Sequence, residues 1–240
     1  MSDVASEDAL HFLFAWILRP AFVEAKRRSG GCRNASANPF PLIHGKTSMP
    51  KTNRSGQALT LTAEQLDAIM AELNAICRAA LSTCRYTAAR VTEALSLRWG
   101  NVTPTDIVIP KAVTKKKMQT RTIPMNPRLW DELARWRVVW TTTHKREPHK
   151  ADFVLPGRRD LATHLTRRNV DYALRAACEK LGIEGCSTHS FRRSALSAAS
   201  DKGVPLRVIQ SISGHSSLEM LQRYLDVKDE QKRQAALAFD

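Results

Sequence analysis

The stretch GHSSLEMLQRYLDV, residues 214–227, decides how the rest of the chain is interpreted. It holds Tyr224, one of only 3 tyrosines in the sequence, and His215 precedes it by nine residues. A tyrosine in a short amphipathic helix can simply pack against the core. Its phenol oxygen can instead act as a nucleophile if cationic groups surround it, because the ordinary pKa of tyrosine is about 10. Other motifs in the sequence are needed to decide whether Tyr224 packs in the core or acts as a nucleophile.

The second unusual property is charge. The chain carries 37 Lys and Arg against 23 Asp and Glu, a formal net charge of +14. Its 240 residues and 43% hydrophobic content are ordinary for a globular protein with a sizeable core. Such a basic excess favours a polyanionic partner, and double-stranded DNA comes first. The basic residues are not gathered on one amphipathic helix, so no membrane partner is expected.

Composition divides the chain into two regions. Residues 1–57 contain a short apolar helix over residues 9–18, about half the length a membrane span needs, and then a basic, Pro- and Gly-rich linker. Residues 58–240 show regular periodicity and form the main domain, which ends in a C-terminal helix. The 5 cysteines form no C-x-x-C pair and no secretory signal is evident, which favours reduced thiols in a cytoplasmic protein.

Periodicity predicts an α+β fold that is mainly α-helical, with a small antiparallel sheet. Between residues 106 and 125, β-branched residues flank a basic centre, which indicates a hairpin. Residues 152–156 indicate a short strand or turn, and Thr188 and Gly203 are the expected caps of one helix. The predicted helical segments are residues 61–83, 89–99, 126–140, 166–183, 188–203, 205–213, 217–225 and 229–239.

Metal and nucleotide cofactors are not expected. The acidic residues are scattered and no Cys/His ligand spacing occurs in the sequence. The segment HGKTS at residues 44–48 suggests a phosphate-binding P-loop, but Phe40 stands where that loop needs its first glycine. If the target is a phosphodiester, its charge must then be neutralised by arginines, whose planar fork pairs two phosphate oxygens.

Three further motifs supply such cations. HSFRR, residues 189–193, places His189, Arg192 and Arg193 on one helical face. ARVTEALSLRW, residues 89–99, places Arg90 and Glu93 one turn apart. The hairpin presents a basic centre made of Lys115, Lys116, Lys117 and Arg121. Taken singly, each motif has an ordinary explanation: a solvated face, an intrahelical ion pair, or a loop that grips a nucleic-acid backbone.

The order of these motifs is more specific than any one of them. Arg-x-x-Glu, a lysine hairpin, His-x-x-Arg, Gly-His and a tyrosine nine residues later resemble the catalytic domain of the tyrosine recombinase (phage integrase) family, from about residue 58 to 230. The resemblance implies a site-specific DNA recombinase that works without metal or ATP. It would cut and rejoin DNA through a covalent 3′-phosphotyrosyl intermediate.

The resemblance also implies residue roles. Tyr224 would be the nucleophile, while Arg90 and Arg192 would clamp the phosphate oxygens. His189 and His215 would complete the phosphate pocket.

Further roles surround this pocket. Glu93 would orient Arg90. Lys116 would protonate the leaving oxygen, with Lys115 as the close alternative because hairpin lengths vary. Lys115, Lys117 and Arg121 would contact DNA, and Arg193 would either contact the DNA backbone or serve a structural role.

The sequence departs from the family pattern in three places. Ala88 stands where the family often has glycine, and Ser213 replaces a common leucine before Gly-His. Residues 1–57 are short for the family's DNA-clamping region, so the chain is expected to be either a minimal member of the family or one with a truncated form of that region. By likeness to the family, the C-terminal helix would dock on a neighbouring protomer in a tetramer on two DNA sites, with intramolecular packing as the alternative. An accessory DNA-bending protein is a further partner to test.

Three other functions stay open at this level. Residues 205–225 could form a helix-turn-helix of a DNA-binding regulator without catalysis. A type IB topoisomerase has a similar core and chemistry. A decayed integrase would keep the motifs without the activity.

Overall fold

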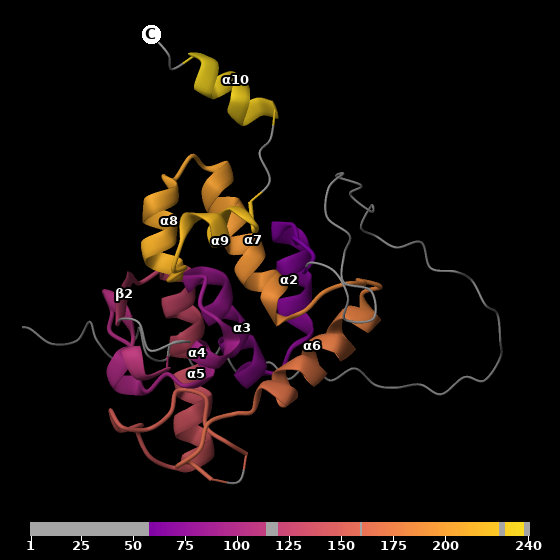
Figure 1. Ribbon diagram of the computed structural model, residues 1–240. Coiled ribbons are helices and arrows are strands. Elements are labelled where there is room, and N and C mark those ends of the chain that lie inside the picture. Colours follow the sequence, from indigo (N-terminus) through magenta and orange to yellow (C-terminus); the bar gives the residue numbers. More distant parts are fainter. Residues whose placement is uncertain (1–57, 114–119, 159, 226–228, 238–240) are drawn as a thin grey trace, which may run out of the picture. The chain divides into compact units, whose positions relative to one another are not determined.

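The computed structural model describes residues 58–113, 120–158, 160–225 and 229–237 (Figure 1). The predicted helix and linker of residues 1–57 and the hairpin lysines 115–117 lie outside these residues. The strands are β1 (Asp106–Ile109) and β2 (Arg121–Pro124). The helices are α2 (Ala63–Glu72), α3 (Ala75–Thr87), α4 (Val91–Leu95), α5 (Pro127–His144), α6 (Arg167–Lys180), α7 (Thr188–Asp201), α8 (Leu206–Ser213), α9 (Leu218–Gln222) and α10 (Asp229–Leu237). The mainly helical α+β class is confirmed.

The single helix predicted over residues 61–83 is wrong, because Asn74 starts a new helix. Leu73 is extended and ends α2, and the Asn74 side chain accepts a hydrogen bond from the N–H of Cys77 at 3.0 Å. Asparagine is a preferred N-cap for this reason. The apolar periodicity runs through both helices, so it does not reveal the break.

The helix predicted over residues 89–99 is also shorter than expected. Only Val91–Leu95 is α-helical, and Arg90 is its extended N-cap. The Glu93 carboxylate accepts the backbone N–H of Arg90 at 2.9 Å, which satisfies a donor that the first turn leaves open. Trp99–Asn101 form a separate 3-10 turn. Arg90 is therefore held at a helix start and not along a helix face.

The hairpin prediction is confirmed. β1 and β2 are antiparallel, with Ile107 opposite Ile123 and Ile109 opposite Arg121. Ile107, Ile109 and Ile123 are buried, and Arg121 shares their inward face because side chains alternate along a strand.

Some predicted ends shift by a residue or more. Thr188 is the first residue of α7 and Ser187 is its N-cap, so the cap was predicted one residue late. Gly203 has a positive φ of 75° just after α7, as expected of a residue that ends a helix. α5 continues to His144. Residues 152–156 supply isolated bridges, such as Arg98 with Phe153, in place of a strand.

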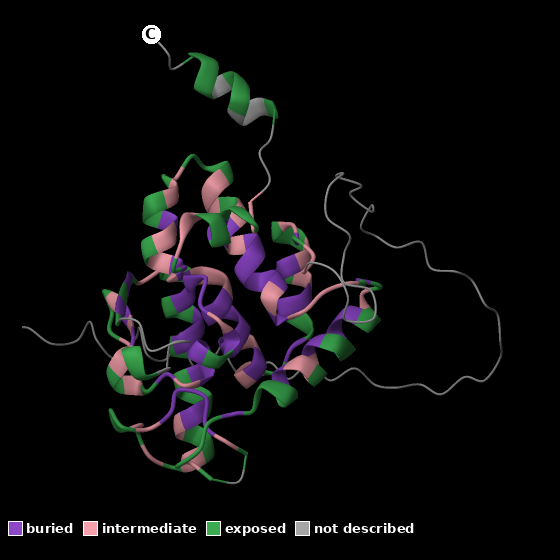
Figure 2. Cartoon of the chain, in the orientation of Figure 1, coloured by how far each residue is buried: buried purple, intermediate pink, exposed green. Residues whose placement is uncertain are grey.

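The core is built around α3. Eight of its 13 residues are buried, and it packs against α4, α5, α6 and α7, as the purple segments of Figure 2 show. None of its residues is exposed, and its buried set includes the hydroxyl residues Ser82, Thr83 and Thr87 beside the apolar ones. A smaller cluster of Ala88, Leu196, Ile209 and Leu221 joins α7, α8 and α9, with Tyr224 packed against it. No helix among the described residues is both long and apolar enough to cross a bilayer.

Two non-glycine residues hold left-handed backbone where helices end. Ala88 follows α3 with φ 51°, and Lys145 follows α5 with φ 55°. The left-handed region costs an L-residue about 1–2 kcal/mol. At Ala88 that cost is largely offset, because its methyl group is buried in the smaller cluster and burial of one such group stabilises by about 0.8 kcal/mol. This burial explains why alanine is tolerated at residue 88, where the family often has glycine.

We predict that Lys145→Gly raises the free energy of unfolding by about 0.5–1 kcal/mol, because it relieves the strain at an exposed residue. Ala88→Gly removes a buried methyl group as well, so its effect should be near zero or destabilising. Urea denaturation of both variants measures the difference. A larger gain for Ala88→Gly than for Lys145→Gly would contradict the argument.

Candidate active site

Arg192 lies at the centre of the site. Its side chain comes from α7 and the residue is 2% exposed. The guanidinium donates to the carbonyl of Ala88, to the carbonyl of Ser213 at 2.9 Å and to the imidazole Nε2 of His215 at 3.1 Å. Ala88 ends α3 and Ser213 ends α8, so one cation satisfies carbonyl groups at two helix C-termini.

A second cluster forms around Glu93, which is fully buried. Its Oε1 accepts from Arg90 Nη1 at 3.0 Å, and its Oε2 accepts from Arg121 Nη2 at 2.6 Å. The predicted pairing of Glu93 with Arg90 is therefore present. Charge-assisted bonds of this kind hold both guanidinium groups in fixed orientations.

Arg121 connects the hairpin to α8. Its Nη1 donates to the carbonyl of Ile212 at 2.8 Å, and its side chain passes over Gly214. A Cβ at residue 214 would lie 2.7 Å from Arg121 Nη1 and 2.8 Å from its Cζ, and the φ of Gly214 is +67°. Only glycine fits both conditions. The glycine of the Gly-His motif is needed because an arginine lies against it.

His215 is held as a neutral imidazole. The residue is 6% exposed, and its ring centroid lies 5.1 Å from that of Tyr224. Burial, followed by the positive charges of Arg192, Arg90 and Arg121, lowers the pKa of His215 from 6.5 to about 3. Burial likewise lowers the pKa of Arg192 to about 10, which still leaves it charged at neutral pH.

Two further catalytic candidates, His189 and Tyr224, lie among the described residues. His189 is half-buried in the first turn of α7, one turn before Arg192. Tyr224 follows α9 and is half-buried, and its N–H donates to the carbonyl of Leu221 at 2.9 Å. The Tyr224 phenol interacts favourably with the charged Arg192, an effect that raises the pKa of Arg192 against the larger effect of burial. Arg90, Arg192, His215 and Tyr224 thus converge from distant parts of the sequence.

The basic residues assigned to DNA contact divide into two groups. Lys115, Lys116 and Lys117 lie outside the described residues. Arg121 and Arg193 are only 5% and 3% exposed, although the sequence assigned DNA contact to Arg121 and either DNA contact or a structural role to Arg193. Arg193 donates to Thr60 Oγ1 at 2.8 Å and to the carbonyl of Arg223 at 3.3 Å, which favours the structural alternative.

Sequence reasoning missed the structural role of Arg121 and the partners of Ser213. The signal for Arg121 was present, since strand alternation places it on the same face as Ile123. The Ser213 hydroxyl lies 2.7 Å from His215 Nδ1, and no sequence pattern indicates that contact.

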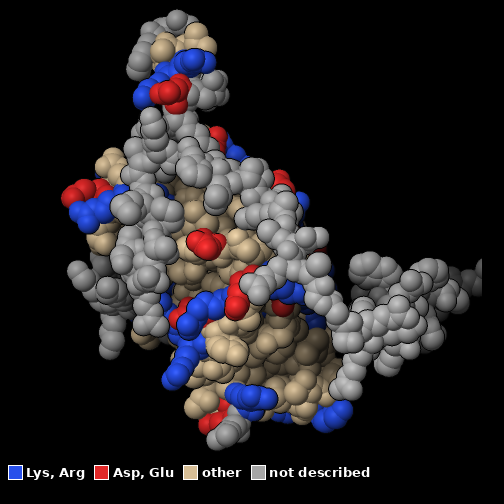
Figure 3. All heavy atoms as spheres, turned by 90° about the vertical axis from the view of Figure 1, so that its right-hand side faces the viewer, with Lys and Arg blue, Asp and Glu red and all other residues tan. Residues whose placement is uncertain are grey.

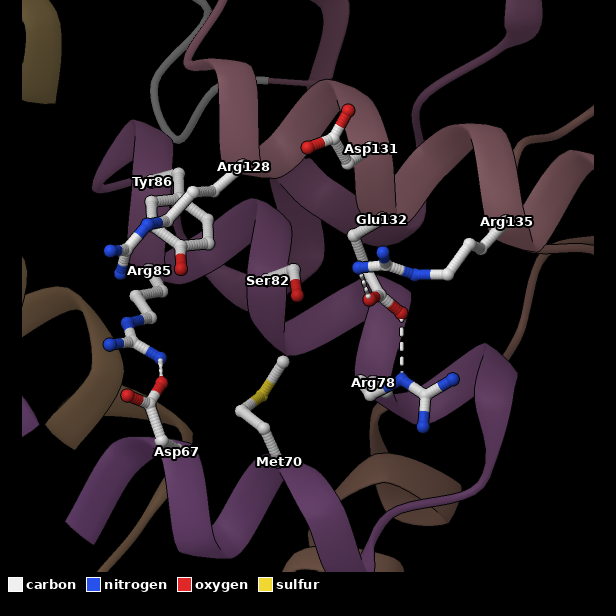
Figure 4. A pocket seen from close by; sticks show the side chains of 10 residues that line it. All are labelled: Asp67, Met70, Arg78, Ser82, Arg85, Tyr86, Arg128, Asp131, Glu132 and Arg135. Atoms are coloured by element: carbon white, nitrogen blue, oxygen red, sulfur yellow. Dashed lines mark hydrogen bonds and ion pairs between the residues drawn. The ribbon is translucent and has the colours of Figure 1, made fainter. Parts of the chain in front are cut away.

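A cavity of about 250 Å³ lies elsewhere, between α2, α3 and α5 (Figure 4). Its charged side chains largely pair with each other: Arg85 with Asp67, and Arg78 and Arg135 with Glu132. None of the predicted catalytic residues lines it. Since three of its four arginines are paired with carboxylates of the same wall and no candidate catalytic residue lies there, it is not the candidate active site.

Charge is mixed on at least one face of the domain. Figure 3 shows basic and acidic side chains lying next to one another there. Among the described residues, no group of three His, Cys, Asp or Glu is placed to bind a metal ion. The concentration of positive charge that matters chemically is the one around Arg192.

Residues 60–231 match the sequence model of the phage integrase family, and the chain belongs to this family. It is 30% identical over 120 residues to the tyrosine recombinase XerA of Thermococcus kodakarensis, a match that covers 50% of this chain and 40% of XerA. It is 28% identical over 151 residues to XerC of Bifidobacterium longum, covering 60% of this chain and 41% of XerC. The match therefore spans less than half of either relative.

Solved structures share the fold. The crystal structure of XerA recombinase superposes with a TM-score of 0.59 at 19% identity, covering 75% of this chain and 65% of XerA. The Tn1549 transposon integrase in complex with a circular intermediate DNA gives a TM-score of 0.61 at 16% identity, covering 77% of this chain and 66% of that integrase.

We predict that Glu93→Gln lowers the free energy of unfolding by about 3 kcal/mol, because it leaves Arg90 and Arg121 without their buried counter-charge. Glu219→Gln is the matched control, since Glu219 pairs with Arg223 at the exposed surface and should change little. Chemical denaturation of both variants measures the contrast. An equal loss of stability in the two variants would show that burial of Glu93 does not strengthen its contribution to folding.

His215 predicts a pH dependence of stability. Below pH 6.5 the unfolded chain binds a proton at residue 215, whereas the folded protein does so only near pH 3. The stability of the fold with a neutral, buried His215 is therefore intact above pH 6.5, and part of it is lost as the pH falls toward 3. Between pH 7 and 5 the wild type should lose about 1–2 kcal/mol more stability than His215→Gln. Parallel stability curves for the two proteins would contradict a neutral, buried His215.

Proposed function

We propose that this protein is a site-specific DNA recombinase in which Tyr224 is the nucleophile. One observation carries the proposal. Arg90 at the start of α4, Arg192 on α7, His215 in the α8–α9 turn and Tyr224 after α9 meet around one buried guanidinium. A helix-turn-helix regulator would need only the α8–α9 segment and gives no reason for Arg90 and Arg192 to be there. Membership of the phage integrase family supports the same function.

The chemistry follows from the residues. The phenol oxygen of Tyr224 attacks a backbone phosphorus of DNA, an O–P bond to tyrosine forms, and the bond from phosphorus to the 5′-oxygen breaks. The product is a 3′-phosphotyrosyl linkage and a free 5′-hydroxyl. Arg90 and Arg192 stabilise the charge that develops on the non-bridging oxygens. Attack by a 5′-hydroxyl from another strand reverses the step and releases Tyr224.

Two proton transfers complete the step. The phenol proton leaves Tyr224 toward a base, for which His189 is the candidate. Lys116 protonates the departing 5′-oxygen, and Lys115 is the alternative. The covalent intermediate conserves the energy of the broken bond, so neither ATP nor metal is required on this proposal.

The proposed partners are double-stranded DNA and further copies of the chain. Lys115 and Lys117 would grip the DNA backbone, while the burial of Arg121 and Arg193 favours support of the site for these two residues. Four protomers would assemble on two DNA sites through the C-terminal helix, and an accessory DNA-bending protein could assist them. Residues 1–57 would contribute to clamping the DNA. The reaction would take place in the cytoplasm, at the nucleoid.

The test is covalent capture of the protein by DNA. Labelled duplexes from the regions flanking its own gene, nicked near the candidate crossover so that cleavage cannot reverse, are incubated with wild type and with Tyr224→Phe. We expect a denaturant-resistant protein–DNA band with wild type and none with Tyr224→Phe, because only the phenol oxygen can form the linkage. Tyr172→Phe is the control, since Tyr172 is 74% exposed on α6, outside the site.

The other outcomes are informative. Binding without a covalent band in any variant would favour a regulator or a decayed integrase. A band that survives Tyr224→Phe would exclude Tyr224 as the nucleophile. Relaxation of supercoiled plasmid of any sequence would favour a type IB topoisomerase.

A further inference from the structure

Ser213 has a side-chain contact that the proposed chemistry does not use. The residue is fully buried at the end of α8, and its Oγ lies 2.7 Å from His215 Nδ1. The leucine common at this position in the family could not make such a contact. A buried hydroxyl so close to a catalytic imidazole calls for a defined donor and acceptor.

The surrounding contacts decide which atom donates. Arg192 carries only donors, and its Nη2 lies 3.1 Å from His215 Nε2 and 3.4 Å from Nδ1, so the guanidinium lies beside the ring and nearer to Nε2. A proton on Nδ1 has the Ser213 oxygen 2.7 Å away as its acceptor, whereas a proton on Nε2 would face the nearer guanidinium N–H. Since the ring is neutral, the single ring proton is on Nδ1, which donates to Ser213 Oγ. The Ser213 hydroxyl can in turn donate to the carbonyl of Gln210, at 3.4 Å.

We propose that Ser213 is a positioning residue whose hydroxyl holds His215 in the Nδ1–H tautomer, with an unprotonated Nε2 beside Arg192. This inference rests on the proposed function only for its catalytic consequence. The backbone carbonyl of Ser213 also accepts a hydrogen bond from Arg192. Ser213 therefore holds both Arg192 and His215, the two residues whose side chains meet.

The hydroxyl has a property that matters once a phosphate occupies the site. A serine hydroxyl can donate or accept. When phosphate oxygens attract the Arg192 donors, the imidazole proton can move to Nε2 and point at the phosphate, while Ser213 turns to donate to Nδ1. A buried polar contact is then kept in both states. Alanine or leucine at residue 213 would leave Nδ1 unpaired in each of them.

The first measurement is the tautomer of His215 in the DNA-free protein, from long-range ¹H–¹⁵N NMR correlations at pH 7. We expect the Nδ1–H pattern in wild type and in Ser213→Thr, and a mixed or Nε2–H pattern in Ser213→Ala. Ser211→Ala is the matched control, because Ser211 is exposed on the same helix. An Nε2–H pattern in wild type, or no change in Ser213→Ala, would overturn the proposal.

The second measurement is covalent capture on the nicked substrate. We expect about a tenfold slower reaction for Ser213→Ala, with recovery in Ser213→Thr and no change in Ser211→Ala. If Ser213→Ala alters the tautomer but reacts at the wild-type rate, the tautomer of His215 does not matter for cleavage. If wild type itself forms no covalent product, the proposed function fails, and the NMR result still decides the role of Ser213.

Discussion

Three guanidinium groups share one buried carboxylate in this protein. Arg90 and Arg121 bond to Glu93 directly, and Arg192 feels its charge from α7. Uncompensated charge inside a protein is strongly unfavourable. The structure offsets the excess with backbone carbonyls at the ends of α3 and α8 and by keeping His215 neutral. A site arranged in this way favours an anion, and on the proposed function a DNA phosphate would supply one.

Arg121 connects this charged cluster physically to the hairpin and to α8. It stands on β2, directly after the segment that carries the candidate acid Lys116, and it grips Glu93 and the last turn of α8. A displacement of β2 would therefore reach Arg90 through Glu93 and His215 through Gly214. On the proposed function, the loop that carries the acid and the arginines that orient the phosphate would therefore move together.

Much of the fold and site was predictable because the relevant signals are local. The hairpin, the late helices and the Arg90–Glu93 pair follow from spacing alone. The break at Asn74 was missed because capping overrides periodicity, and Arg90 was misplaced because Glu93 reaches back to cap α4. The contacts of Arg192 with Ala88 and Ser213 join residues 104 and 21 positions apart, and no one-dimensional pattern encodes such distances.

Arg192 closes the ends of two helices, and this bears on how such a gene would decay. A copy released from selection for recombination would still be selected against misfolding if the protein persisted for any reason. Substitutions at Arg192 or Glu93 would damage folding and be removed, whereas loss of one oxygen from the half-buried Tyr224 would pass unnoticed. Intact arginines therefore testify mainly to a folded product. The phenol oxygen of Tyr224 has no such folding role among the described contacts, so its presence is the more specific indication of the proposed chemistry.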